Sequence, residues 1–281
     1  MLRSELTLRL ITAAIAVPLL VGVILAGSEL TAAVLALALS VAYLEFMSAG
    51  NVRLRDPLVW VGVAGIGALA GAAASHDIPL AWPLTAAVIA LLATPVMEEL
   101  VRRERRDLLD AAPSVAEVWR ATGLAIVGLV YIGWLGAFAV LLRKLPAGDE
   151  WLLLALFSVI LTDTGAFGTG KLFGRHQLAP RISPNKTMEG ALGGWAVGFS
   201  AVILLRFLPD IEIDYWRIVL LAVVLPLFAQ IGDLVASMIK RAMDVKDFSQ
   251  LLPGHGGVLD RFDSLLFGIP TVYLFVRWLS L

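Results

Sequence analysis

Residues 230–263 read QIGDLVASMIKRAMDVKDFSQLLPGHGGVLDRFD and form a polar interruption between apolar segments. Asp233 and Ser237 are four positions apart, and Lys240 and Arg241 follow at the next turn. Side chains with this spacing lie on one face of a helix. The first half of the stretch therefore predicts a helix that carries an acidic group and two basic groups on the same side.

The second half of this stretch combines a glycine-rich turn with two more carboxylates. Residues 253–257 read PGHGG, a sequence that cannot remain helical and that exposes backbone N–H groups. Asp260 and Asp263 follow at a spacing of three, so they would share one face of a second helix. Carboxylates on both sides of a glycine-rich loop, with basic residues between them, suit a metal ion that bridges phosphates.

Composition identifies the chain as an integral membrane protein. Its 281 residues are 59% hydrophobic and only 16% charged, whereas a soluble domain has about 25% charged residues. The absence of cysteine excludes disulfides, thiolate metal sites and cysteine nucleophiles. We predict an all-α, polytopic membrane protein with about nine transmembrane helices. The apolar segments are 10–27, 31–48, 57–75, 79–97, 121–142, 151–169, 190–208, 217–236 and 264–280.

Basic residues alternate between the predicted loops. Most of the 22 Lys and Arg residues lie in every second loop, counted from the N-terminus. By the positive-inside rule these loops and the N-terminus are cytoplasmic, and the C-terminus is external, in a cell inner (plasma) membrane. The first segment could also be a signal peptide, but the alternation requires it as a span. We expect N-terminal transmembrane helices in 1–120 and a catalytic transmembrane region in 121–281, with cytoplasmic loops at 170–189 and 237–262.

A second polar stretch has the composition of an anion-binding loop. Residues 163–190 read DTGAFGTGKLFGRHQLAPRISPNKTMEG. Glycines let a backbone approach an anion, basic side chains supply countercharge, and a helix that begins at Glu189 would direct its positive end toward that anion. A structural re-entrant turn with solvated cations is the alternative. The predicted phosphate contacts are Lys171, Arg175, Ser183, Lys186 and Thr187.

Three carboxylates lie inside apolar segments. Glu45, Asp163 and Asp233 each fall near the predicted cytoplasmic end of a span, so they would lie at one depth, level with both polar stretches. An ionisable residue within a membrane segment indicates a functional site by default. For Glu45, a helix-packing hydrogen bond or a side chain that reaches the interface is the stronger interpretation.

The two polar stretches also resemble the signature of a known enzyme family. S-x-x-K-R from Ser237, KD from Lys246 and LPGHGGVLDRFD from Leu252 are similar to the pattern of the phosphatidate cytidylyltransferases (CDP-diacylglycerol synthases). The earlier stretch resembles a second block of the same family, with Phe167 where tyrosine is expected. This specific resemblance covers the C-terminal part of the chain. The N-terminal half agrees only in its hydrophobic spans and in the acidic residue of the second one.

The resemblance implies a reaction in which CTP and phosphatidic acid give CDP-diacylglycerol and pyrophosphate. It also implies dependence on a divalent cation, for which the oxygen ligands favour Mg²⁺, alone or with a second cation. Because the reaction joins two anions, catalysis would consist mainly of positioning and charge neutralisation. The expected partners are CTP, phosphatidic acid and membrane lipids, with no nucleic acid.

Roles follow for individual side chains. Asp233 and Asp260 are the expected metal ligands, and Asp263 is a weaker third. His255 could bind a phosphate or protonate the leaving pyrophosphate; we favour binding, because the lipid phosphate is already ionised. The predicted catalytic set is Asp233, Lys240, Arg241, His255, Asp260 and Arg261. The predicted substrate-binding set is Lys171, Arg175, Ser183, Lys186, Thr187 and Ser237.

Other functions remain open at this point. A transporter or channel would also place acidic residues in spans, but here the motifs lie in loops on one face. A polyprenol kinase would also need a nucleotide-binding cytoplasmic face, whereas the D-G-x-x-A-R pattern of the CDP-alcohol phosphotransferases does not occur. The Gly/Ala-rich segment 57–75 could pack within the chain or against a second copy in a homodimer.

Overall fold

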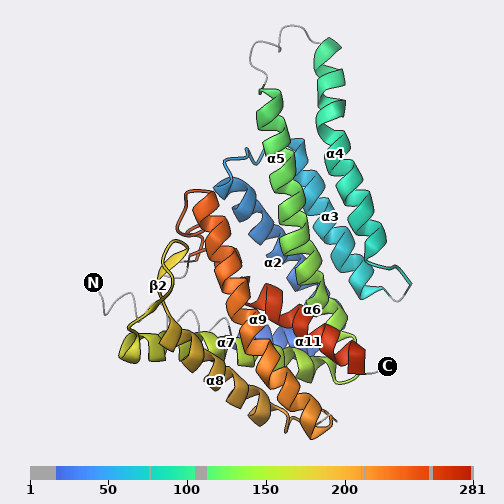
Figure 1. Cartoon of the computed structure of the whole chain (residues 1–281). Helices are drawn as coiled ribbons and strands as arrows, with labels where there is room; N and C mark the ends of the chain where they lie inside the picture. The colour runs from blue at the N-terminus through green and yellow to red at the C-terminus, as the bar shows by residue number, and fades with distance from the viewer. Residues whose placement is uncertain are drawn as a thin grey trace.

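The protein is an all-α polytopic membrane protein, as its composition predicts (Figure 1). The computed structural model describes residues 17–75, 77–104, 113–209, 211, 213–252 and 256–279. Within these residues, 7 helical segments are long and apolar enough to cross a membrane. They are α2 (Ser28–Ala49), α3 (Pro57–Ala74), α4 (Ala81–Glu104, apolar to Leu100), the continuous run Val115–Arg143, α7 (Gly148–Phe173), α8 (Met188–Leu205) and α9 (Tyr215–Ala242).

The structure does not confirm the predicted count of nine spans. The first apolar segment begins outside the described residues, and its described part is a shorter apolar helix, Val17–Ala26. The last segment forms α11 (Leu265–Leu279), whose 15 residues are fewer than the roughly 20 that cross a bilayer without tilt. The other seven predicted segments coincide with the seven long helices.

One hydrophobic core joins the two halves of the chain. Tyr43 of α2 and Leu69 of α3 are fully buried in the same cluster as Ile218 of α9 and Leu259 of α10 (Leu259–Phe262). Figure 1 shows α3, α4 and α5 side by side, with α7, α8 and α9 grouped at the other end of the molecule. Helices on both sides of residue 120 contribute to this core, so the core does not separate the two regions there. The predicted division into an N-terminal and a catalytic region remains a prediction.

Helices α7 and α8 pack with their backbones in close approach. A Cβ atom added to Gly194 of α8 would lie 2.8 Å from the carbonyl oxygen of Thr162 in α7, closer than real side chains come. Small residues at such contacts let membrane helices pack tightly. This packing fixes the helix that carries Asp163 against the helix that begins at the second polar stretch.

The run Val115–Arg143 contains a π-helical turn that the sequence does not predict. It comprises α5 (Val115–Gly128), η2 (Leu129–Trp134) and α6 (Leu135–Arg143). Segments of π-helix are rare, and they are frequent at functional sites. The turn packs against the N-terminal helices, since a Cβ at Gly133 would approach Ile66 to 3.0 Å.

The predicted cytoplasmic loop 170–189 is more ordered than expected. Helix α7 continues to Phe173, a short antiparallel hairpin of β1 (Gln177–Ala179) and β2 (Ser183–Thr187) follows, and α8 begins at Met188. The hydroxyl of Thr187 accepts a hydrogen bond from the Gly190 N–H and so caps α8. The predicted helix start at Glu189 is therefore confirmed to within one residue.

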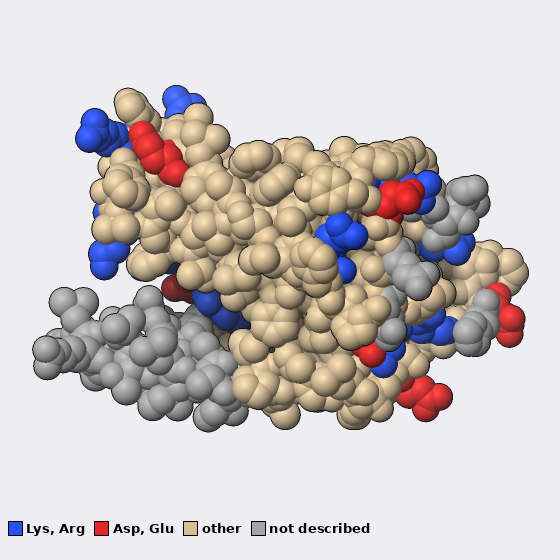
Figure 2. Space-filling model, turned by 90° about the horizontal axis from the view of Figure 1, so that it is seen from below, with Lys and Arg blue, Asp and Glu red and all other residues tan. Residues whose placement is uncertain are grey.

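The surface supports membrane insertion. Figure 2 shows one face on which a broad uncharged area lies in the middle and most Lys, Arg, Asp and Glu side chains gather toward the two ends. Large apolar side chains are exposed on the helices, among them Leu204 of α8 and Trp216 of α9. Exposed apolar area on this scale is costly in water, and lipid removes that cost.

Candidate active site

The two polar stretches meet at one place in the structure. Lys186 Nζ of β2 lies 2.6 Å from Asp233 Oδ2 of α9. Close by, Arg241 Nε donates a hydrogen bond to the carbonyl oxygen of Ile182 at 3.2 Å. The hairpin therefore folds against α9 and brings the two polar stretches into contact, as expected if they form two halves of one site.

A cavity lies between the hairpin and helices α7, α8 and α9. Its volume of about 470 Å³ falls within the range of small-molecule sites. Two lysines and two carboxylates supply its charges, and the remaining lining is largely apolar. The residues concerned include Asp163, Phe167, Lys171, Leu178, Lys186 and Asp233.

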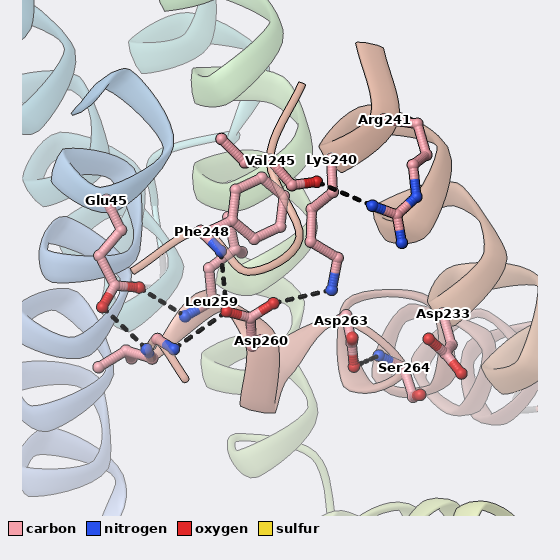
Figure 3. A network of polar contacts seen from close by, with 12 residues as sticks. Glu45, Asp233, Lys240, Arg241, Val245, Phe248, Leu259, Asp260, Asp263 and Ser264 are labelled. Carbon is pink, nitrogen blue, oxygen red and sulfur yellow. Dashed lines mark hydrogen bonds and ion pairs between the residues drawn. The ribbon is translucent and has the colours of Figure 1, made fainter. Parts of the chain in front are cut away.

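Two of the carboxylates that line this cavity, Asp163 and Asp233, act electrostatically on a third, Asp263. Asp163 accepts a hydrogen bond from Ser264 Oγ at 3.3 Å, and it interacts electrostatically with Asp233. Asp263 in turn lies within electrostatic range of both Asp233 and Asp163; Figure 3 shows Asp233 and Asp263 near one another. Burial, together with the negative charge of Asp233, raises the pKa of Asp263 well above its usual range. A cation bound here would reverse that effect.

Asp260, the other predicted metal ligand, is engaged by protein groups. Lys240 Nζ donates to its Oδ1 at 2.8 Å, and the backbone N–H groups of Phe248 and Gly257 donate to its Oδ2 at 3.0 Å. The residue is 6% exposed. Figure 3 shows its carboxylate turned toward Lys240. Asp260 thus holds Lys240 in place and ties the segment after α9 to the start of α10.

The residues present are compatible with Mg²⁺ but do not form a complete cage. Within the described residues, no three Asp, Glu or His side chains converge closely enough to hold a metal ion by themselves. Mg²⁺ usually takes one or two carboxylates and completes its shell with substrate phosphates and water. Asp233 and Asp263 offer such oxygen donors in one electrostatic cluster. The metal assignments to Asp233, Asp260 and Asp263 remain predictions.

The other predicted residues occupy several positions. Lys171 and Thr187 line the cavity, Ser183 lies on β2 and Ser237 on α9. Arg261 lies on α10 and interacts electrostatically with Asp163. Arg175 is exposed, beyond the end of α7, and His255 lies outside the described residues.

Two contributions near the site were not predicted from the sequence. Glu189 accepts hydrogen bonds from the backbone N–H groups of Arg175 and His176 and so fixes the turn between α7 and β1. Tyr131 of η2 is 6% exposed, and its hydroxyl has no hydrogen-bond partner within the described part of the chain. That hydroxyl interacts electrostatically with Asp263, Asp233 and Asp260. The local sequence around Tyr131 carries no polar signal that would have identified it.

Comparison with known proteins gives one consistent result. The model of the Cytidylyltransferase family matches residues 7–279. A phosphatidate cytidylyltransferase of Staphylococcus haemolyticus is 46% identical over 125 residues, 44% of this chain and 48% of the relative. That of Staphylococcus saprophyticus is 37% identical over 173 residues, 62% of each chain. The Bacillus subtilis enzyme is 38% identical over 159 residues, 56% of this chain and 59% of the relative. The alignments thus span roughly half to three fifths of these relatives.

Proposed function

Because the chain belongs to the cytidylyltransferase family, we propose that it transfers CMP from CTP to phosphatidic acid, giving CDP-diacylglycerol and pyrophosphate. Three similar proteins named phosphatidate cytidylyltransferase support this choice of substrates. The observation that carries the proposal is the Lys186–Asp233 contact of 2.6 Å, since it joins both signature stretches at one cavity.

The proposed reaction needs positioning and charge neutralisation from this site. A phosphate oxygen of phosphatidic acid attacks the α-phosphorus of CTP, and the bond between that phosphorus and the oxygen of the leaving pyrophosphate breaks. No covalent enzyme intermediate is required. Lys186, Lys240, Arg241 and Arg261 supply positive charge around the meeting point, so they offset the repulsion between two anions. Asp260 directs the Lys240 ammonium by its 2.8 Å bond.

The cavity is suited to the lipid substrate. Its lining is mostly apolar, but Lys171 and Lys186 lie among the lining residues. A phosphomonoester on an acylated glycerol has the same division, with a charged head and an apolar body. Both Asp163 and Asp233 lie in the C-terminal halves of their helices, so the site is placed toward one end of the bundle rather than at its centre. This position supports a site near the cytoplasmic boundary, where CTP is available.

We propose Mg²⁺ as the divalent cation of the reaction. Asp233 and Asp263 are the better supported ligands: Asp233 is paired with Lys186 through Oδ2 and Asp263 accepts from the Ser264 N–H through Oδ1, whereas both oxygens of Asp260 are already bonded, to Lys240 and two amides. When bound, Mg²⁺ would neutralise charge on phosphate oxygens that these carboxylates alone would repel.

A homodimer is also proposed. Gly62 and Gly65 of α3 pack within the chain, but Gly67 and Gly71 lie on its exposed side, where a second copy could pack against them.

An assay of nucleotide transfer tests the proposal. Purified protein in detergent receives CTP labelled in the cytidine, Mg²⁺ and phosphatidic acid, and both pyrophosphate and labelled lipid are measured. The expected result is equimolar pyrophosphate and CDP-lipid. If no nucleotide is consumed, the enzyme proposal fails. Release of CDP instead of pyrophosphate, with a polyprenol as the acceptor, would identify a kinase.

A further inference from the structure

Glu45 of α2 forms hydrogen bonds with residues far along the chain, at the start of α10 and in the loop before it. Its Oε1 accepts hydrogen bonds from Ser249 Oγ at 2.6 Å and from the Val258 N–H at 2.9 Å. Its Oε2 accepts one from the Leu259 N–H at 2.9 Å. Figure 3 shows the carboxylate directed at the start of α10. The side chain therefore joins α2 to a segment more than two hundred residues later.

The bonds at Glu45 account for a buried charge. The residue is 7% exposed, so its carboxylate has lost most of its contact with solvent. Burial of an unbonded carboxylate would be very costly, and charge-assisted hydrogen bonds from hydroxyl and amide groups offset that cost. Because the donors come from both ends of the segment 249–259, the carboxylate holds these two ends together.

The close approach of Glu45 also explains a glycine of the PGHGG motif. A Cβ atom at Gly257 would lie 2.7 Å from Glu45 Oε2 and 2.9 Å from Ser249 Oγ, so any larger residue would displace the carboxylate. Beside it, the rings of Phe46 and Phe248 are in contact, with centroids 6.1 Å apart. Helix α2 thus holds this segment through the three hydrogen bonds of Glu45 and the ring contact of Phe46.

The Asp260–Lys240 pair of the proposed site lies directly beside this segment, with Asp260 on α10 and Lys240 on α9. Asp260 accepts from the N–H groups of Phe248 and Gly257, close to the groups that Glu45 binds. The two carboxylates therefore bind neighbouring groups of the same loop: Glu45 binds Ser249, Val258 and Leu259, and Asp260 binds the N–H groups of Phe248 and Gly257. A change at Glu45 would be transmitted to Asp260 through Leu259 and Gly257, and from Asp260 to the Lys240 ammonium.

We propose that Glu45 is a positioning residue for nucleotide transfer: by holding Ser249 and the first turn of α10, it aims the Asp260–Lys240 pair at the reacting phosphates. Glu45 is not among the residues that line the cavity, so its proposed role acts through Asp260 and Lys240. This inference rests on the proposed function, but its structural part can be measured without it.

The test combines hydrogen exchange with steady-state kinetics. Glu45→Gln keeps the size of the side chain but removes its charge and replaces one oxygen with an NH₂ group that cannot accept. Exchange of the peptide that contains the Val258 and Leu259 amides should accelerate on the order of tenfold or more, and kcat should fall by a similar factor, while KM for either substrate changes little. Ser249→Ala removes only one donor, so its effect should be smaller. Glu29→Gln, on an exposed position of the same helix, is the matched control and should change neither quantity.

The possible outcomes test the anchoring role and the positioning role of Glu45 separately. Unchanged exchange in Glu45→Gln overturns the anchoring role, and accelerated exchange with unchanged kcat overturns the positioning role. A fall in thermal stability as large in Glu29→Gln as in Glu45→Gln would show a general effect of losing charge from α2 and would overturn it too. If the unmodified protein makes no CDP-lipid, the proposed function fails, and exchange alone then decides whether Glu45 anchors the segment.

Discussion

Asp260→Asn is the substitution for which the structure gives the clearest quantitative expectation. The Lys240–Asp260 pair is buried, with 12% of the lysine side chain and 3% of the aspartate side chain exposed. Removal of one partner from a buried ion pair costs about 3–5 kcal/mol, because the other charge is left without compensation. The asparagine retains one oxygen that can accept from the Phe248 and Gly257 amides. We therefore expect destabilisation near the lower end of that range, about 3 kcal/mol.

A second substitution at Lys240 should restore the stability that Asp260→Asn loses, but it should not restore turnover. In the double variant Lys240→Met with Asp260→Asn, no buried charge remains, so most of the lost stability should return. Turnover should stay low in both variants, because the site lacks the ammonium or its orienting partner. Unfolding in detergent, followed through the fluorescence of the 8 tryptophans, measures stability, and pyrophosphate release measures turnover.

Two results would refute this reasoning. If Asp260→Asn unfolds at the same temperature as the unmodified protein, the pair is not buried as described. If the double variant is less stable than the single one, Lys240 has a stabilising role apart from Asp260, and the charge argument is wrong.

Three further predictions concern the same site. Asp233→Asn should reduce turnover by at least about a hundredfold and lower stability by about 1–3 kcal/mol, because the side chains of the pair are 30% and 25% exposed but Lys186 Nζ, which loses its charged partner, is itself buried; near-normal turnover would remove Asp233 from the site. Lys186→Ala should raise the KM of a substrate by about tenfold, measured in the CDP-lipid assay, and unchanged KM values for both substrates would contradict its role in phosphate binding. Tyr131→Phe removes a buried hydroxyl that has no partner within the described residues, so stability should rise by about 1 kcal/mol; a loss of stability on thermal unfolding would show that the hydroxyl is bonded after all.

The sequence predicted the parts of the fold that depend on local pattern. Hydropathy located seven long helices, because a span needs about 20 consecutive apolar residues. Helical spacing placed Asp233, Ser237 and Lys240 on one helix, α9, as observed. The resemblance to a known family identified both polar stretches, and the Lys186–Asp233 contact shows that they belong together.

Features that depend on distant contacts could not be predicted in this way. Glu45 bonds to Val258 and Leu259, and nothing near either end of that contact indicates the other. The metal-binding role of Asp260 remains a prediction, and its bonds to Lys240 and two amides could not be predicted because they form only in the folded chain. The hairpin β1–β2 was missed because strands of three and five residues give too little alternation to recognise. The π-helical turn η2 could not be predicted, because its sequence, LVYIGW, has the same apolar character as the α-helices on either side of it.

The Glu45 contact also sets an order on the assembly of the protein. Chains are synthesised from the N-terminus, so α2 is made long before the ribosome reaches Val258 and Leu259. During that interval the Glu45 carboxyl lacks the three donors that it binds in the finished protein. Closure of the segment around Glu45 therefore belongs to the last stage of folding, and a chain that ends before α10 would leave this carboxyl group without the donors that it binds in the finished protein.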